Sequence, residues 1–487
     1  METVNVGNKR ILFWDDFFID DDKTSAKLVL EHPVKKELAI DLNKEWEGDG
    51  CAYFHTVKFG DMYRMYYVAG MIEKDGESLK RSVCFIESRD GIHWSRPSLK
   101  IHEFNGSYDN NIILRQSDED AFDNLFIFID TNPECPEDEK VKGVGMRYDK
   151  TKPFPAERQL WCYTSSDGIH FRRAWMMTDG SVKNGGIFDS LNTVYWDDEV
   201  KKYKGYIRGI HDADEKRDIR YIESTDFKNW SEPVLLNFGD SDDYPLYTNV
   251  VSQYYREKSM LVGFPTRYID RGRWVKNYDL MGTPKAVECR KERMKNNPRY
   301  GLVLTDGIFM TSRDGVNWHK FDEAFVIPEI EHDRNWVYGD CYIAKAMIET
   351  PCESPAINSE ISLYMYEGHW SKYNSPLYRY TIRIDGFASY TSGYEPSDIY
   401  TVPFTFDGDG LEINFKTSAR GYIFVDFLDE YGRLYEEFKS MEIFGNSLQR
   451  RVFFGETDDI SALAGKPVRM HIRMSDASIY SMRFIKK

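Results

Sequence analysis

The chain has 487 residues, of which 41% are hydrophobic and 15% aromatic, and its formal net charge at pH 7 is −16. This length exceeds one compact core of ordinary size, so we expect two domains, or one large repeat domain with an accessory domain. The negative charge argues against nucleic acid or an anionic membrane surface as a partner, because either would need a basic face. No stretch approaches the roughly 18 apolar residues that cross a bilayer, and no secretory signal is visible at the start, so we expect a cytoplasmic protein.

The seven cysteines are scattered along the chain, and no two of them have CxxC spacing. This distribution predicts neither a zinc site nor a framework of disulfides. We therefore expect reduced thiols, as in an intracellular protein.

A short motif recurs along the chain: Ser-x-Asp-Gly, followed three residues after the Gly by an aromatic residue. Its copies lie at 88–94, 165–171, 224–230 and 312–318, and a shortened copy lies at 383–387. In the third copy Phe227 stands where the others have Gly. Gly supplies the positive φ of a tight turn, so we interpret the motif as a structural turn and not as a catalytic element.

Short alternating strands precede each copy of the motif. In chain order they are 52–59, 63–68 and 82–87; 125–130, 141–148 and 160–164; 191–196, 203–208 and 219–224; 247–255, 260–267 and 307–311; and 342–347, 361–366 and 377–382. Five such units, each with a fourth short strand, predict a five-bladed β-propeller in which the motif leaves the third strand. The fifth unit lacks its outer strand. Residues 10–14 can supply it and close the ring, or they can form a loose N-terminal strand.

Two further segments differ from the repeats. Residues 270–300 form a long basic insertion in the fourth unit, which we interpret as a lid or as a contact in a homo-oligomer. After residue 396 the motif stops, and short strands with polar turns predict a β-sandwich. The predicted class is therefore all-β, with a catalytic propeller at 1–395 and an accessory sandwich at 396–487.

Charged residues recur where the strands of different blades should converge. A carboxylate precedes each predicted first strand, at Asp49, Asp123, Asp189, Asp243 and Asp340. The second strands end at Arg147, Arg208, Arg267 and Glu367. A single Asp at such a position is more often a turn residue. Five of them facing cations indicate glycosidic bond cleavage, which needs one carboxylic acid and one carboxylate.

The start of the first unit resembles a known family. Trp46-Glu47-Gly48-Asp49-Gly50, followed by a strand, resembles the Trp-x-Asn-Asp-Pro-Asn-Gly start of the invertase-like glycoside hydrolases of family 32, relatives of family 43. The resemblance implies a five-bladed propeller glycosidase with its nucleophile at Asp49. The orienting carboxylate of the family would fall on Asp189 or Asp123, although the Arg and Pro of that motif are absent.

The general acid of the family has no match, because no Glu-Cys pair lies where it is expected. Glu367 is the first candidate for this acid and Asp243 the second. We expect the substrate, a carbohydrate, to contact Asp243, Asp340, Arg147, Arg208, Arg267, Tyr247, Asn249 and Trp336.

Two other functions remain open from the sequence. In a glycoside phosphorylase of similar fold the arginines would bind phosphate, and the same arginines would also suit a uronic acid or a sulfated sugar. A propeller that only binds sugars is the third reading. We expect no cofactor and no bound metal, because His55 and His369 have no second ligand at metal-site spacing. A Ca²⁺ ion in the channel stays open as an alternative, since carboxylates suit it.

Overall fold

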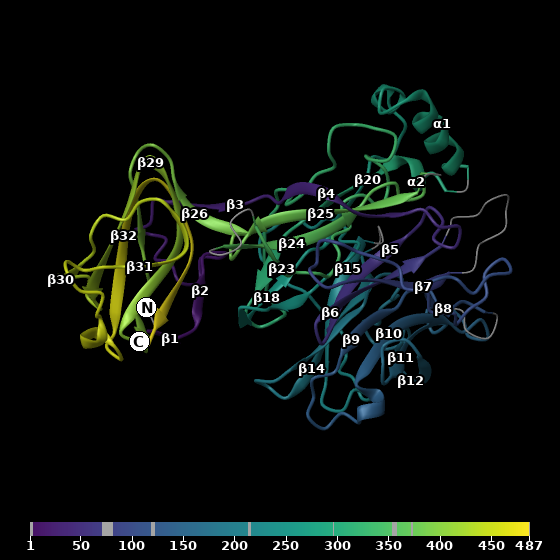
Figure 1. Cartoon of the computed structure of the whole chain (residues 1–487), viewed down its shortest axis with the longest axis horizontal. Coiled ribbons are helices and arrows are strands. Elements are labelled where there is room, and N and C mark those ends of the chain that lie inside the picture. The colour runs from purple at the N-terminus through teal and green to yellow at the C-terminus, as the bar shows by residue number, and fades with distance from the viewer. Residues whose placement is uncertain are drawn as a thin grey trace.

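The computed structural model describes residues 3–70, 81–117, 122–212, 216–295, 297–352, 358–371 and 374–486. Five four-stranded sheets lie around a common axis, and a separate ten-stranded sheet lies at the other end of the molecule (Figure 1). The predicted all-β class, a five-bladed β-propeller with a β-sandwich, is confirmed. Within the described ranges, no helix is both long and apolar enough to span a bilayer.

Each blade is antiparallel, and its strands follow the order expected from the sequence. Blade 1 consists of β5 (Ala52–Phe59), β6 (Met62–Ala69), β7 (Ser82–Ser88) and β8 (Ile112–Arg115). Blade 2 consists of β9 (Phe126–Ile129), β10 (Val141–Tyr148), β11 (Arg158–Ser165) and β12 (Arg172–Asp179). Blade 3 consists of β13 (Thr193–Asp197), β14 (Lys202–His211), β15 (Lys216–Ser224) and β16 (Val234–Leu235).

Blade 4 contains an extra two-stranded sheet. Its main strands are β17 (Ser252–Tyr254), β18 (Glu257–Gly263), β21 (Met310–Ser312) and β22 (His319–Lys320), and the extra sheet is β19 (Thr266–Asp270) with β20 (Val303–Gly307). Blade 5 consists of β23 (Ile348–Pro351), β24 (Ser359–Tyr366), β25 (Ser375–Arg383) and β4 (Val34–Leu42).

The strand that completes blade 5 is β4, so the prediction that residues 10–14 close the ring is wrong. β4 pairs with β25 from Leu42↔Ser375 onward, whereas β2 (Arg10–Leu12) pairs with β32. An outermost strand meets solvent on one side, and the charged residues Lys35, Lys36 and Glu37 of β4 suit that position. Phe13 and Trp14 are instead almost fully buried, which suits the junction with the second sheet.

The second sheet forms the β-sandwich and contains strands from both ends of the chain. Its further strands are β1 (Val4–Gly7), β3 (Lys27–Leu30), β26 (Ala388–Ser392), β27 (Ser397–Tyr400), β28 (Phe404–Phe406), β29 (Gly410–Asp429), β30 (Leu434–Lys439), β31 (Asn446–Arg451) and β32 (Val468–Ile485). β29 and β32 pair along most of their length. The strand pairing therefore joins the first strands of the chain to the C-terminal region, and the division at residue 395 stays a prediction about domains.

The recurring Ser-x-Asp-Gly motif forms the same turn in four blades. In blade 1, Oδ1 of Asp90 accepts the backbone N–H groups of Ile92 and His93 at 2.8 Å, and the hydroxyl of Ser88 accepts the N–H of Gly91 at 2.9 Å. Gly91 has a φ of 73°. These bonds stay within the turn, in line with a structural motif.

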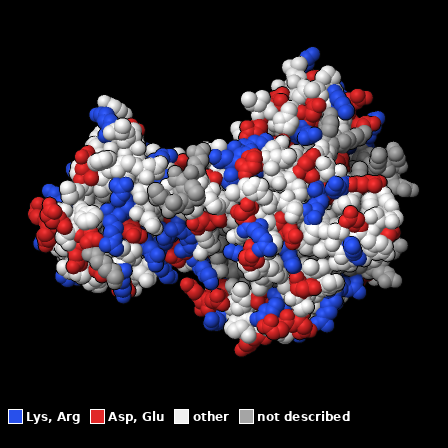
Figure 2. Space-filling model, viewed as in Figure 1, with Lys and Arg blue, Asp and Glu red and all other residues white. Residues whose placement is uncertain are grey.

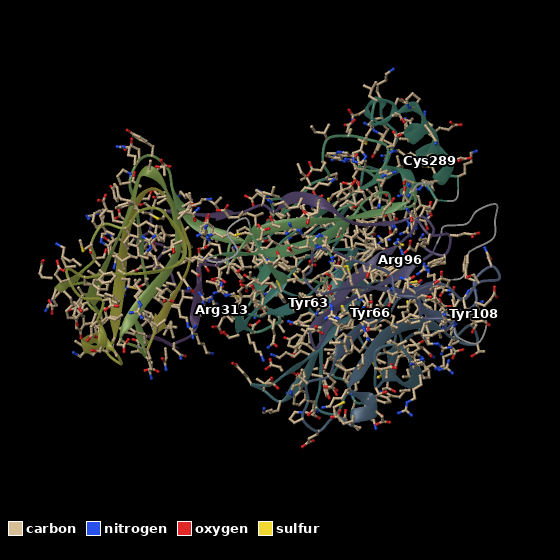
Figure 3. All side chains as sticks on the ribbon, in the orientation of Figure 1. Tyr63, Tyr66, Arg96, Tyr108, Cys289 and Arg313 are labelled. Atoms are coloured by element: carbon tan, nitrogen blue, oxygen red, sulfur yellow. The ribbon has the colours of Figure 1, made fainter. Side chains whose placement is uncertain are left out.

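Tyrosines from neighbouring blades attach to these turns. The hydroxyl of Tyr66, labelled in Figure 3, donates to the carbonyl of Gly168 in the next blade at 2.9 Å. Tyr206 donates to Gly315 in the same way at 3.2 Å. A Cβ at Gly168 would lie 2.6 Å from the Tyr66 hydroxyl oxygen. The motif therefore also holds adjacent blades together.

The basic insertion in blade 4 contains helix α1 (Pro284–Arg293), which stands out from the propeller in Figure 1, and the short α2 (Arg299–Leu302). α1 begins where Thr283 caps it by accepting the N–H of Ala286, and Pro284 occupies the first turn. The guanidinium of Arg290 donates 2.5 and 3.1 Å hydrogen bonds to the carbonyls of Trp336 and Gly301. Through its bond to Trp336, the buried Arg290 therefore links the insertion to the chain that follows blade 4.

The surface shown in Figure 2 has acidic and basic side chains interspersed over both the propeller and the sandwich. No continuous basic field covers this face.

Candidate active site

The inner strands of the propeller begin at one end of its axis, which we call the aspartate end. Four of them follow Asp49, Asp123, Asp189 and Asp340. In blade 4 the equivalent position is Tyr247, not Asp243. The N–H of Tyr247 donates to the carbonyl of Thr266 at 2.7 Å, as the N–H of Asp123 does to Met146 at 2.9 Å. Because adjacent strands are antiparallel, second strands end and third strands begin at the same end.

Asp123 and Asp189 lie in one cluster with three arginines. Arg81 forms an ion pair with Asp123 and donates to its backbone carbonyl at 2.6 Å. Nη1 of Arg158 lies 3.7 Å from Oδ2 of Asp189, and Nη2 of Arg208 lies 3.6 Å from Oδ1. Burial raises the pKa of Asp123; Arg81 opposes this shift and Asp189 adds to it. The two carboxyl groups thus have different environments, one more buried and one between two cations.

The cluster reaches solvent through Asp189, whose side chain is 31% exposed, whereas that of Arg208 is only 2% exposed. Nη1 of Arg208 donates to the carbonyl of Tyr247 at 2.6 Å, and its guanidinium lies 4.7 Å from the centre of the Tyr247 ring. Nε of Arg208 is buried and has no hydrogen-bond partner among the described residues. The buried guanidinium of Arg208, whose Nε–H has no partner among the described residues, therefore lies next to the accessible carboxylate of Asp189.

The segment that resembles family 32 contains two buried carboxylates, Glu47 and Asp49. Glu47 is fully buried and accepts hydrogen bonds from Arg96, labelled in Figure 3, and from the Tyr67 hydroxyl, both at 2.7 Å. Asp49 is 8% exposed, and its backbone carbonyl accepts the N–H of Trp370 at 2.7 Å. Glu47 thus holds the segment in place, while Asp49 lies at the aspartate end beside an indole ring.

Aromatic side chains form a wall next to Asp49. The rings of Trp370 and His369 stack at 4.4 Å, and Tyr338 lies 5.0 Å from Trp370. Tyr247 stacks on Tyr342 at 5.6 Å. Trp370 is only partly buried, whereas Tyr338 and Tyr342 are buried. Of these rings, Trp370 is the one with surface available for a sugar ring.

Asp340 is buried, and Glu367 lies in a pocket beside the outermost strand β4. Asp340 is 2% exposed, and its Oδ2 accepts the N–H of Val337 at 2.9 Å. Burial raises the pKa of Asp340 to about 8, against the opposing effect of that hydrogen bond. Glu367 pairs with Lys35 at 2.5 Å and lies 3.4 Å from Nε2 of His332. Glu367, Lys35 and His332 line a pocket of about 720 Å³ beside the outermost strand β4.

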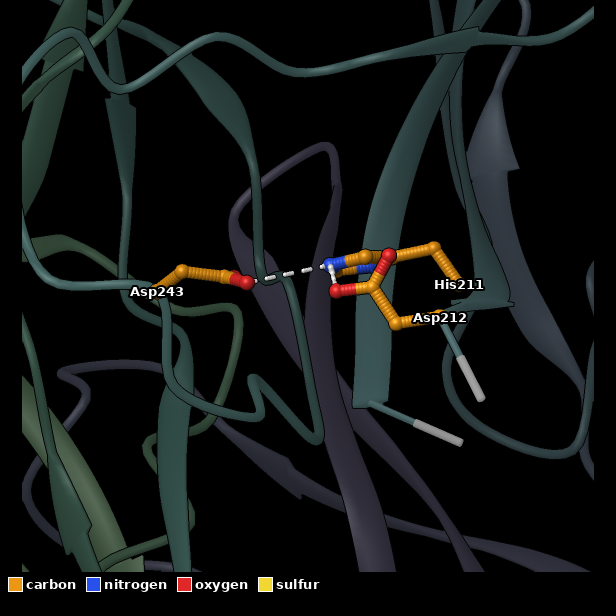
Figure 4. Close-up of side chains that lie close together, drawn as sticks. All are labelled: His211, Asp212 and Asp243. Carbon is orange, nitrogen blue, oxygen red and sulfur yellow. Dashed lines mark hydrogen bonds and ion pairs between the residues drawn. The ribbon is translucent and has the colours of Figure 1, made fainter. Parts of the chain in front are cut away.

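Asp243 lies in a separate exposed group with His211 and Asp212 (Figure 4). Nε2 of His211 lies 3.3 Å from Oδ2 of Asp243 and 3.7 Å from Oδ2 of Asp212. The same oxygen of Asp243 accepts a 2.8 Å hydrogen bond from Nζ of Lys216. This group has the atoms to ligate a metal, but the Lys216 ammonium already supplies the positive charge there.

Of the three arginines expected to meet the substrate, the structure brings only Arg208 to the aspartate cluster. Arg147 lies one residue out of step with Arg208 relative to the blade, so its side chain faces the opposite side and lies 5.3 Å from the Trp161 ring. Arg267 forms a bidentate pair with Asp306 at 2.9 and 2.6 Å.

Asn249 and Trp336 also contact protein groups. The amide of Asn249 donates to the carbonyls of Leu191 and Tyr206 at 2.9 and 3.0 Å, and its oxygen accepts the Thr193 hydroxyl at 3.0 Å. Nε1 of Trp336 donates to the carbonyl of Glu329 at 2.8 Å. Asn249 therefore links blades 3 and 4, and Trp336 packs beside the insertion.

Sequence reasoning missed Arg81 and Arg158, the arginines nearest to Asp123 and Asp189. Arg81 directly precedes β7, and Arg158 is the first residue of β11. β7 and β11 are the third strands of their blades, and third strands begin at the same end of the propeller as first strands. Extending the search for charged residues to the starts of third strands would have found them.

No family model matches the sequence, and no curated protein matches it. Several solved structures resemble the fold. One is titled "Glycoside hydrolase" (12% identity, TM-score 0.47, 72% of this chain and 92% of that chain). Another is an N-acetylgalactosamine deacetylase from F. plautii in complex with blood group B trisaccharide (12% identity, TM-score 0.42, 93% and 95%). A third is a family 32 β-fructofuranosidase from Bombyx mori (9% identity, TM-score 0.41, 93% and 95%).

Proposed function

We propose that the protein is a carbohydrate-active enzyme that cleaves a glycosidic bond at the aspartate end of its propeller. The observation that carries this proposal is the shared cluster of Asp123 and Asp189 with Arg81, Arg158 and Arg208. Glycosidic cleavage needs one protonated and one ionised carboxyl group on either side of the bond. The cluster supplies two carboxyl groups in unlike environments, and one of them is open to solvent.

The environments indicate how the roles divide. Burial raises the pKa of Asp123, which favours the protonated form that a general acid needs. Asp189, between Arg158 and Arg208, is the candidate carboxylate that orients substrate and stabilises positive charge at the anomeric carbon. Asp49 is the candidate nucleophile, on its resemblance to family 32 and its place beside Trp370. Glu367 is retained as the alternative acid, in its neighbouring pocket.

Phosphorolysis of a glycoside is a second candidate. The cluster holds three guanidinium groups near two carboxylates, and Nε of the buried Arg208 has no hydrogen-bond partner among the described residues. Arginine suits phosphate and carboxylate groups because its donors form a planar fork. A phosphate, or the acidic group of a uronic or sulfated sugar, would therefore suit this cluster.

A screen of nitrophenyl glycosides and oligosaccharides, each with and without inorganic phosphate, tests the proposal. Hydrolysis predicts release of free sugar that does not depend on phosphate, whereas phosphorolysis predicts sugar phosphate only when phosphate is present. Saturable binding of an oligosaccharide without turnover would instead support a binding propeller. The anomer released first reports whether the reaction inverts or retains configuration.

A further inference from the structure

A second pocket, of about 540 Å³, lies next to the aspartate cluster, where blade 3 meets the insertion of blade 4. Its wall includes Arg217 of β15, Tyr268 of β19, and Arg299, the first residue of α2. The ring of Tyr247 connects the pocket with the cluster. The guanidinium of Arg208 lies 4.7 Å from the centre of that ring, and the guanidinium of Arg217 lies 6.0 Å from it. The proposed reaction does not use the pocket.

Arg217 repeats an arrangement that is found at two other junctions between blades. Arg81 directly precedes the third strand of blade 1, and Arg158 and Arg217 are the first and second residues of the third strands of blades 2 and 3. The backbone carbonyl of each arginine accepts an N–H from the chain that leads into the next blade, and these N–H groups belong to Gln116, Gly180 and Leu246 in turn. The three arginines therefore occupy corresponding places around the propeller axis.

The carboxylate partner is missing at the third of these junctions. At the first junction the arginine pairs with Asp123, and at the second it lies 3.7 Å from Asp189. Before the inner strand of blade 4, Tyr247 takes the place of the aspartate. A neutral phenol ring cannot supply the counter-charge that the two aspartates supply elsewhere. Arg217 therefore has the position of a paired arginine without the acidic residue that completes the pair.

Both arginines of the pocket lack a counter-charge. Within the described part of the chain no carboxylate forms an ion pair with Arg217 or Arg299, and the nearby Asp243 pairs with Lys216 instead. Asp270 at the rim accepts a backbone N–H at 2.8 Å. The Nε atoms of Arg217 and Arg299 are buried and have no hydrogen-bond partner among the described residues. Because arginine keeps its charge over the whole physiological pH range, the pocket contains two cations with unused hydrogen-bond donors.

The two guanidinium groups lie around the same tyrosine. The guanidinium of Arg217 is 4.5 Å from the centre of the Tyr268 ring. That of Arg299 is 5.9 Å from the centre of the Tyr338 ring, which lies edge-on to Tyr268 at 5.8 Å. Burial raises the pKa of Tyr268, and the positive charges of Arg217 and Arg299 both oppose this shift. Both cations therefore act on the same part of the pocket.

We propose that this pocket binds the acidic group of a sugar, a carboxylate or a sulfate, between Arg217 and Arg299. The acidic group supplies the counter-charge that an aspartate supplies at the other two junctions, and the planar forks of the arginines match its oxygens. The volume of the pocket is in the range of small-molecule sites. Its role as a subsite beside the cleaved bond rests on the proposed function, whereas the binding of an acidic sugar does not.

Isothermal titration calorimetry of the full chain tests the pocket with glucuronate, galacturonate and glucose 6-sulfate, and with glucose and galactose as matched neutral sugars. We expect saturable binding of at least one acidic sugar, and at least tenfold weaker binding of its neutral counterpart. Tighter binding of a uronate would identify a carboxylate ligand, and tighter binding of glucose 6-sulfate would identify a sulfated sugar. Arg217→Met and Arg299→Met should each weaken binding of the acidic sugar by about tenfold or more, because each removes a charged hydrogen bond.

Lys216→Met is the matched control, since it removes an equal charge one residue away, from an ammonium that pairs with Asp243. It should leave the affinity for the acidic sugar nearly unchanged. Arg217→Lys keeps the charge but loses the planar fork, so it should lose less affinity than Arg217→Met. If Arg217→Met does not fold, Arg217→Lys and Arg299→Met provide the same comparison with the control.

Absence of saturable binding for all three acidic sugars would overturn the proposal. Equal affinity for acidic and neutral sugars would do so as well, as would an equal loss of affinity in Lys216→Met and the arginine variants. These results would leave the proposed cleavage standing, because turnover of neutral glycosides is measured separately. Binding of an acidic sugar that depends on Arg217, in a protein that turns over no glycoside, would instead refute the cleavage and support the pocket.

Discussion

The hydroxyl of Tyr254 in blade 4 donates a 2.6 Å hydrogen bond to Oδ1 of Asp385, the aspartate of the shortened turn motif. Oδ2 of Asp385 accepts the Ser481 hydroxyl of the sandwich at 2.7 Å and pairs with Arg10 and Arg256 at 3.2 and 3.4 Å. The fifth copy of the motif has thus lost its turn chemistry and joins the propeller to the sandwich instead.

Asp385→Asn should therefore destabilise the protein strongly. The change leaves Arg10 and Arg256 without their buried counter-charge, and removing one partner of a buried pair costs about 3–5 kcal/mol. Urea unfolding measures the loss, and Asp314→Asn, in a turn whose hydrogen bonds stay local, should cost less. Equal losses in the two variants would show that Asp385 is not the link between the two parts.

The turn aspartates predict a pH dependence of stability. Hydrogen bonds from the backbone N–H groups of Asn229 and Lys228 hold the pKa of Asp226 well below its usual range. Because the folded pKa lies below the unfolded value of about 3.9, this contribution is present above that pH and is lost as the pH falls. The free energy of unfolding of Asp226→Asn should fall less than that of the wild type between pH 5 and acidic pH; parallel curves would refute the assignment.

The raised pKa of Asp340 predicts a change of stability with pH in the opposite direction. Its folded pKa of about 8 lies above the unfolded value of about 3.9, so the folded state binds the proton more tightly. Stability should therefore fall as the pH rises between these two values. Asp340→Asn keeps an oxygen for the Val337 N–H and should remove this part of the decline. Urea unfolding at pH 5 and pH 7.5 compares the two proteins, and an identical decline in both would contradict the raised pKa.

Arg208 and Arg147 face opposite sides of their blades, so we expect their substitutions to have different effects on ligand binding. Arg208→Met and Arg158→Met should each weaken binding of an acidic or phosphate-bearing ligand by about tenfold or more, since a charged hydrogen bond is worth roughly 1.5–3 kcal/mol. Arg147→Met is the control, because its side chain lies against Trp161. Calorimetric titration of each variant measures this, and an effect confined to Arg147→Met would contradict the geometry.

The repeated elements of the fold could be predicted from the sequence because their signals are local. Period-two alternation and the Ser-x-Asp-Gly turn identified the inner strands of blades 1 to 4. In blade 5 the predicted inner strand, 342–347, is wrong, because β23 covers Ile348–Pro351. The strand that completes blade 5 could not be identified this way, because the charged and apolar residues of β4, Val-Lys-Lys-Glu-Leu-Ala-Ile-Asp-Leu, do not alternate. The apolar residues 10–14 read as the better strand, yet they belong at the junction with the sandwich.

The residues of the site can be identified only when equivalent positions of different blades are aligned. A single sequence does not show that alignment. The sequence suggests Asp243 as the carboxylate before β17, but the backbone hydrogen bonds place Tyr247 at the equivalent position. The sequence also suggests that Arg147 corresponds to Arg208, although a shift of one residue reverses the side chain in a strand. Helix α1 was missed although Thr283-Pro284 is a typical helix start.

Turnover and Tm of Asp189→Asn, measured on one sample with the best glycoside from the screen, test the central claim most directly. Asp243→Asn serves as the control, since Asp243 lies in the separate group with His211 and Lys216. The account predicts that Asp189→Asn folds with a Tm close to that of the wild type and loses about 10²-fold or more of its turnover, whereas Asp243→Asn stays active. A stable Asp189→Asn protein with full turnover would contradict catalysis by the aspartate cluster.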